Sequence, residues 1–175
     1  MKLVLIGTLS TLVLFLAYIS TRESRFRYER NGFIQAPVEP VFALVSSFKN
    51  GQKWNPFAQK DPNMKVSFRG EEGKPGFAMD FEGNREAGAG TLELLKLEPN
   101  QAVDIRLTMT KPFKAVNLIE YRLKPEANGT RFSWAMSGDG GFMGKLLNVF
   151  IDCEKMIAGE FEKGIENLKK ISESK

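Results

Sequence analysis

Apolar and polar residues alternate along seven segments of the chain, and this period of two predicts β-strands. In the clearest segment, Val103–Met109, every second residue is apolar and the residues between are polar. In another, the apolar phase shifts from Leu94 to Leu95, which predicts a β-bulge. The turns between the last six segments are short and rich in Gly, Pro or Asn, as in an antiparallel meander. The seven segments are Arg25–Ala36, Met64–Arg69, Phe77–Glu82, Gly88–Leu97, Val103–Met109, Lys114–Leu123 and Thr130–Ser137.

Three other segments have helical patterns. Val38–Ser47 and Phe48–Asp61 predict two short helical segments directly after the first strand. After Gly141 the spacing of apolar residues changes to three and four, and Lys145–Ser172 predicts one long amphipathic helix. Its apolar stripe comprises Leu146, Leu147, Phe150, Cys153, Met156, Ile157, Phe161, Ile165, Leu168 and Ile171.

Together these elements predict an α+β fold, with a curved seven-stranded antiparallel sheet wrapped around the C-terminal helix. One face of such a sheet has to be covered, and only this helix is long enough to cover it. A strongly curved sheet around a long helix leaves a hollow between the two layers. Such a hollow is a typical place for an apolar ligand.

The first residues have a different pattern. Leu3–Ser20 has no charged residue and is apolar on every face, which favours a transmembrane anchor over a helix of the globular part. The alternative is a secretory signal, either cleaved or retained, but small residues are poorly placed for cleavage. We therefore expect an anchor at residues 1–21 and one globular domain at residues 22–175.

Charge bears on the side of the membrane and on the class of partner. Four arginines, Arg22, Arg25, Arg27 and Arg30, follow the apolar run. The positive-inside tendency then predicts a single-pass membrane protein with its domain in the cytoplasm. Beyond residue 30 acidic and basic residues nearly balance, although the whole chain has a net charge of +4. No basic stripe remains for nucleic acid.

The composition excludes several kinds of chemistry. The chain has no histidine, which is the side chain best suited to proton transfer near pH 7, and one cysteine, Cys153. One cysteine rules out an intrachain disulfide and a cysteine-based metal cluster. Gly83, Gly88 and Gly90 do not stand between a strand and a helix, so they do not form a dinucleotide-binding motif. We expect no cofactor and no metal.

Alternation and helical spacing together predict which side chains face the hollow. Large apolar side chains there serve either as core or as cavity lining. Asn117 and Tyr121 are polar, and they are expected either to bond to neighbouring elements or to contact an oxygen of a ligand. Asp80 and Glu82 are expected to point outward, whereas the phase shift leaves the direction of Glu93 open. The expected lining residues are Phe68, Met79, Phe81, Leu107, Met109, Asn117, Tyr121, Trp134, Met136, Phe150 and Ile157.

Several phrases of the sequence resemble a known family. They are IQAPVEPVFALVSSFKNGQKWNPF (Ile34–Phe57), FEGN and AGAGTLEL (Phe81–Leu94), RLTMTKPFKAVN (Arg106–Asn117), GTRFSWAMSG (Gly129–Gly138) and KMIAGEFEKGIENLKK (Lys155–Lys170). On these phrases the chain resembles the polyketide cyclase/dehydrase-like family of the START and birch-pollen-allergen (SRPBCC) superfamily. The resemblance implies a helix-grip fold with a cavity for lipids, sterols, polyketides or similar molecules. It does not imply cyclase activity, because most such chains lack a recognisable catalytic set.

Three functions are compatible with these observations. The favoured hypothesis is a membrane-tethered, monomeric and non-catalytic domain that binds an apolar small molecule or lipid. The second is a cyclase- or dehydrase-type enzyme that uses acidic residues or Tyr121 in place of histidine. The third is a protein-interaction module, which would need an exposed apolar patch away from the anchor.

Overall fold

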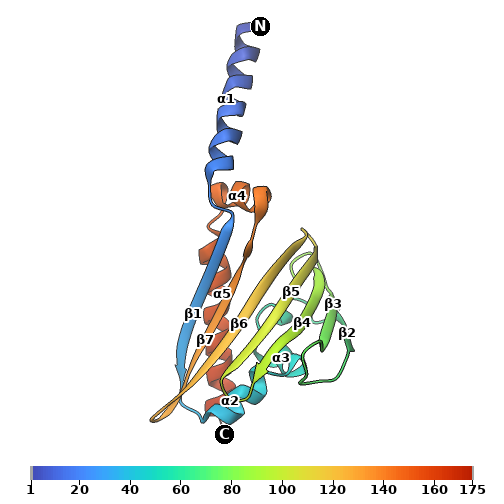
Figure 1. Ribbon diagram of the computed structural model, residues 1–175, viewed down its shortest axis with the longest axis vertical. Coiled ribbons are helices and arrows are strands. Elements are labelled where there is room, and N and C mark those ends of the chain that lie inside the picture. The colour runs from blue at the N-terminus through green and yellow to red at the C-terminus, as the bar shows by residue number, and fades with distance from the viewer. Residues whose placement is uncertain (1, 175) are drawn as a thin grey trace.

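The computed structural model describes residues 2–174 and, within the first helix, side chains from residue 7 onward. The described chain forms one sheet and five α-helices, and the long C-terminal helix runs beside the sheet (Figure 1). The helices are α1 (Lys2–Thr21), α2 (Val38–Val45), α3 (Phe48–Trp54), α4 (Gly141–Phe150) and α5 (Cys153–Glu173), with a short 3-10 turn at Ala58–Lys60. The strands are β1 (Arg25–Ile34), β2 (Lys65–Arg69), β3 (Ala78–Glu82), β4 (Ala89–Glu98), β5 (Ala102–Lys111), β6 (Ala115–Glu126) and β7 (Gly129–Asp139).

The seven strands form one antiparallel sheet in the order β1-β7-β6-β5-β4-β3-β2. Strands β2 to β7 follow one another as a meander, and β1 pairs with β7 at the other edge. The predicted bulge is confirmed, because the register between β4 and β5 shifts between Leu94 and Lys96. The curved sheet and the long C-terminal helix confirm the predicted α+β helix-grip fold.

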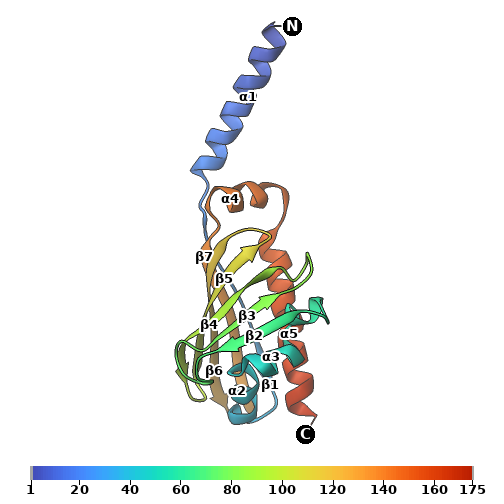
Figure 2. The ribbon, with the colours of Figure 1, turned by 90° about the vertical axis from the view of Figure 1, so that its right-hand side faces the viewer.

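Alternation along the strands separates a concave face, which α5 covers, from an outer face (Figure 2). On α5 the residues that face the sheet, among them Phe161, Ile165 and Leu168, are buried. The helix lies very close to β1, since a Cβ atom placed on Gly32 would come within 2.5 Å of Ile165 Cγ2. A glycine in this strand therefore lets the helix approach the sheet.

The short helices α2 and α3 close one end of the concave face. Val41 and Val45 on α2 and Trp54 at the end of α3 are buried. The indole Nε1 of Trp54 donates a hydrogen bond to the carbonyl oxygen of Leu44 at 3.1 Å, which ties α3 to α2. The hydroxyl of Thr130, fully buried on β7, donates to the carbonyl oxygen of Ala36 and so fixes the approach to α2.

The single helix predicted at Lys145–Ser172 is wrong in one respect, because the segment contains two helices. Helix α4 ends at Phe150, and α5 begins at Cys153. Asp152 caps α5, because its side chain accepts a hydrogen bond from the backbone N–H of Lys155. The spacing of apolar residues continues across the break, and the helical period alone therefore did not reveal it.

Helix α1 projects from the end of the sheet beside α4 (Figure 1). The rings of Phe15 and Phe150 lie 6.3 Å apart, and Lys145 Nζ donates to the carbonyl oxygen of Ser20. These contacts connect α1 to α4 and not to the sheet.

The predicted membrane anchor has to be corrected. Among the residues described, no helix is both long enough and apolar enough to cross a membrane. The side chains of residues 3–6, which belong to the predicted anchor, lie outside the described set. On this finding the single-pass anchor is wrong, and the membrane localisation and sidedness inferred from it are withdrawn.

Candidate ligand-binding face

The concave face of the sheet has two halves that differ in burial. At the end nearer α2, its side chains are buried; we call this the packed half. At the end nearer the turn between β5 and β6, the side chains remain partly exposed; we call this the open half. The packed half includes Leu94, Val103, Ile105, Tyr121, Phe132 and Trp134. The open half consists of Phe81, Leu92, Leu107, Met109, Asn117 and the facing Ile157 of α5.

Aromatic rings fill the packed half. The ring of Trp134 stacks on Phe161 of α5 with the centroids 4.4 Å apart, and it meets the rings of Trp54 and Tyr121 edge to face. Phe57, in the turn after α3, adds an edge contact to both Trp134 and Phe161. This part of the concave face is a solid aromatic core.

Register places the strand residues of the open half side by side. Leu92 on β4 pairs with Leu107 on β5, which in turn pairs with Asn117 on β6. Phe81 lies next to Gly90 on the neighbouring strand β4, and Met109 pairs with the same glycine from the other side. A Cβ atom at Gly90 would meet the carbonyl oxygen of Thr108 at 2.4 Å and Phe81 Cζ at 3.1 Å. Because Gly90 has no side chain, the side chains of Phe81 and Met109 lie on either side of bare β4 backbone.

The predicted lining residues fall into four groups. Phe81, Leu107, Met109 and Asn117 lie on neighbouring strands of the open half, and Ile157 on α5 is partly buried. Phe68 on β2 is 38% exposed, and its ring stacks on the buried ring of Phe77. Tyr121 and Trp134 lie in the packed half. Met79 and Met136 are buried in the same core. Phe150 lies on α4 facing Phe15, with 72% of its surface exposed, and is separate from the concave face.

The two polar candidates have different surroundings. Tyr121 is 4% exposed, and burial raises the pKa of its phenol far above the usual value. It therefore stays protonated at neutral pH and is a poor acid–base catalyst there. Asn117 is partly exposed in the open half. None of the six side chains of the open half is ionisable.

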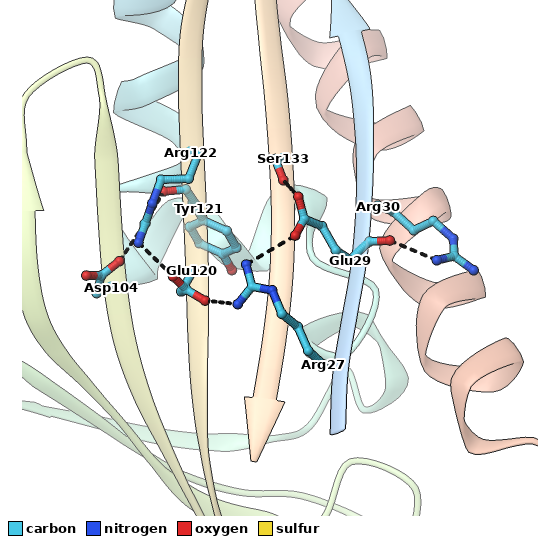
Figure 3. A network of polar contacts seen from close by, with 8 residues as sticks. All are labelled: Arg27, Glu29, Arg30, Asp104, Glu120, Tyr121, Arg122 and Ser133. Carbon is cyan, nitrogen blue, oxygen red and sulfur yellow. Dashed lines mark hydrogen bonds and ion pairs between the residues drawn. The ribbon is translucent and has the colours of Figure 1, made fainter. Parts of the chain in front are cut away.

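Charged residues lie instead on the outer face, where they form a ladder across four strands (Figure 3). Arg122 on β6 bonds to Asp104 on β5 and to Glu120, and Arg27 on β1 bonds to Glu120 and Glu29. The hydroxyl of Ser133 on β7 donates to Glu29 at 2.7 Å and, together with Arg27, holds the pKa of that carboxyl below its usual value. Carboxylates and guanidinium groups thus neutralise one another on the face that does not meet α5.

The carboxylates considered for catalysis also lie on the outer face. Asp80 accepts hydrogen bonds from Arg69 and from the hydroxyl of Thr91, and Glu82 forms an ion pair with Lys111. Glu93, whose direction the sequence left open, pairs with Arg106. These carboxylates have partners and do not enclose a common site, so the arrangement provides no acid–base pair.

Two residues of this surface were missed by sequence reasoning. The sequence places Leu92 on a strand but does not predict that it lies opposite Leu107, because that pairing depends on the register of β4. Gly138 pairs with Asn117, and its importance depends on the register between β6 and β7. Neither relationship produces a signal in the local sequence pattern.

The geometry agrees with comparisons to known proteins. Residues 25–173 match the family described as polyketide cyclase / dehydrase and lipid transport. The chain belongs to this family. The match spans the sheet, the short helices, α4 and α5. No curated protein sequence matches the chain.

Several solved structures of other proteins have a similar fold. Protein MLL2253 from Mesorhizobium loti is 15% identical, with a TM-score of 0.65 over 86% of this chain and 99% of that protein. A Thermobifida fusca protein is 20% identical, with a TM-score of 0.64 over 83% and 92%. The Aha1 dimer from Colwellia psychrerythraea is 18% identical, with a TM-score of 0.61 over 85% and 97%. At these identities the likeness to the three structures shows the fold alone.

Proposed function

We propose that this protein binds an uncharged, mainly apolar small molecule on the open half of its concave face. One observation carries the proposal: Phe81, Leu92, Leu107 and Met109 on one face of the sheet, and Ile157 on α5, remain partly exposed at the border of the buried core. On the same strands, the residues of the packed half are buried. Concave surfaces lined by apolar side chains with few polar groups are typical of small-molecule sites.

The family supports this proposal. Its description includes lipid transport, which requires an apolar binding surface, and the matched residues 25–173 support residues 22–175 as the binding domain. Binding without catalysis fits the chemistry of the surface better than a cyclase- or dehydrase-type reaction. The open half has no ionisable side chain to transfer a proton, and the raised pKa of Tyr121 keeps the phenol protonated.

The direct test is the binding of a neutral apolar probe. N-phenyl-1-naphthylamine becomes fluorescent when it leaves water, so titration of the full chain with this probe should give a saturable rise in fluorescence. Met109→Glu places a charge in the open half and should weaken binding at least tenfold, because burying an unpaired carboxylate is unfavourable. Absence of a saturable signal with the unmodified protein would overturn the proposal.

Thr108→Glu is the matched control. Thr108 precedes Met109 on β5 and, by alternation, faces the other side of the sheet. The same charge introduced there should leave probe affinity unchanged within about twofold. Circular dichroism and thermal melting of both variants would separate a loss of binding from a loss of fold. Equal weakening by the two substitutions would place the probe somewhere other than the open half.

A further inference from the structure

Among the six described residues of the open half, Asn117 alone has a polar side chain. Its neighbours across the sheet are Leu107 on β5 and Gly138 on β7, and Phe26 on β1 pairs with Gly138 beyond. Along its own strand the next residues on the same face are Ala115 and Ile119. Within the described part of the chain, no hydrogen bond joins the Asn117 side chain to another residue. An unpaired carboxamide therefore lies within an otherwise apolar surface.

Gly138 provides the space for this carboxamide. A Cβ atom on Gly138 would lie 2.3 Å from Asn117 Oδ1 and 3.1 Å from Phe26 Cζ. The amide oxygen consequently occupies the position that a side chain on β7 would otherwise fill. The Asn117 carboxamide can hold this position only because residue 138 is a glycine.

This arrangement constrains what can cover the open half. In the free protein, water can satisfy the partly exposed amide. A purely apolar molecule that displaced this water would leave the amide without a partner, and the cost corresponds to about tenfold or more in affinity. A molecule with a hydroxyl, carbonyl or amide group could replace the lost hydrogen bonds. An ionised group would fit poorly, because no side chain of the open half carries a compensating charge.

We infer that Asn117 is a specificity-determining residue that selects apolar molecules carrying an uncharged hydrogen-bonding group. The inference rests on the proposed function, because it assumes that the open half is the binding surface. It goes further by assigning the ligand class: neutral alcohols, ketones, esters or amides with an apolar body. Saturated hydrocarbons and free carboxylates are the classes that it excludes.

A matched set of competitors tests the inference against the fluorescent probe on the full chain. The competitors 2-acetylnaphthalene, 2-ethylnaphthalene and 2-naphthoate share one ring system and differ in a carbonyl, an alkyl and a carboxylate group. The unmodified protein should bind the acetyl compound at least tenfold more tightly than the other two. In Asn117→Leu, the preference for acetyl over ethyl should fall at least tenfold. Val116→Leu, an apolar exchange at the residue before Asn117 that by alternation faces the other side of the sheet, should leave that preference unchanged.

Gly138→Ala gives a second route to the same result without removing the amide. The new methyl group would displace the flexible end of Asn117, so the preference for the acetyl compound should fall while the ethyl compound still binds. Melting curves should show that both variants remain folded.

The outcomes separate this inference from the proposed function. If the fluorescent probe binds but the acetyl preference is absent, or survives Asn117→Leu, the inference is overturned and the proposed function stands. Binding of 2-naphthoate as tight as that of 2-acetylnaphthalene would overturn the requirement for an uncharged group. If the fluorescent probe does not bind, the proposed function fails and this inference fails with it.

Discussion

Gly164 lies directly against the ring of Trp134, because a Cβ atom on Gly164 would come within 2.5 Å of Trp134 Cζ3. The same atom would lie 3.1 Å from Pro56 Cδ. Helix α5 can therefore approach the aromatic core of the packed half only because residue 164 has no side chain. The tryptophan ring cannot move aside easily, since Phe161 stacks on it and Trp54 and Tyr121 meet its edges.

Gly164→Ala should destabilise the protein by about 1–3 kcal/mol, because overpacking outweighs the gain in helix propensity. The matched control is Gly159→Ala in the same helix, where nothing lies within 4 Å of an added Cβ atom. That substitution should stabilise the protein by about 0.5–1 kcal/mol. Urea denaturation of the two variants measures the difference. Stabilisation by Gly164→Ala would mean that α5 does not pack on Trp134 as described.

Phe161→Asp should prevent folding or lower the melting temperature drastically, because an unpaired charge would be placed between α5 and the sheet. Phe161 is 1% exposed, whereas Met156 on the same helix is 57% exposed. Met156→Asp should therefore change stability by less than about 0.5 kcal/mol. Thermal melting followed by circular dichroism compares the two. A stable Phe161→Asp variant would contradict the orientation of the helix.

The outer-face ladder should contribute more to stability than an isolated surface ion pair. Arg122 bonds to Asp104 and Glu120, whose side chains are only 20% and 17% exposed. Arg122→Met should cost about 1–2 kcal/mol, because both carboxylates lose a charged partner. Arg131→Met removes the exposed pair with Glu126 and should cost clearly less. Equal losses in denaturation experiments would argue against a cooperative ladder.

Glu29 should make stability depend on pH in the acidic range. Its pKa in the folded protein lies below the ordinary value of 4.5, first because of the Ser133 hydroxyl and then because of Arg27. In the window below 4.5 the unfolded chain binds more protons, so this stabilisation is present above pH 4.5 and is lost as pH falls through the folded pKa. Glu29→Gln should therefore show a smaller loss of stability between pH 7 and pH 3. An unchanged pH dependence would contradict this role of Glu29.

Local patterns predicted the strands and the bulge well, because each depends on neighbouring residues. Alternation in Val103–Met109 identified the face that packs on the core, and the phase shift at Leu95 located the bulge that the register confirms. The break between α4 and α5 was not predicted. The break coincides with the cap that Asp152 places on α5 and with the packing of α4 beside α1. Neither feature changes the three- and four-residue spacing of apolar residues, so the spacing could not predict the break.

The candidate site was predicted only in part for the same reason. Alternation selected Leu107, Met109 and Asn117 as inward-facing residues, and it selected Trp134 by the same rule. It could not distinguish the filled half of the concave face from the open half. That difference depends on where α2, α3 and Phe161 pack, which is a property of elements far apart along the chain.

By itself, the sequence determined the α+β class, the seven strands, and which strand side chains face inward. It also determined that the side chains expected to line the concave face are uncharged. Period, turn residues and side-chain type are local properties, so they can be read along the chain. Only the tertiary structure decided that Asn117 lies over Gly138 and that Gly164 lies against Trp134. Both relationships depend on the pairing register and on helix–sheet distance, which arise from the packing of the whole domain and not from any one segment.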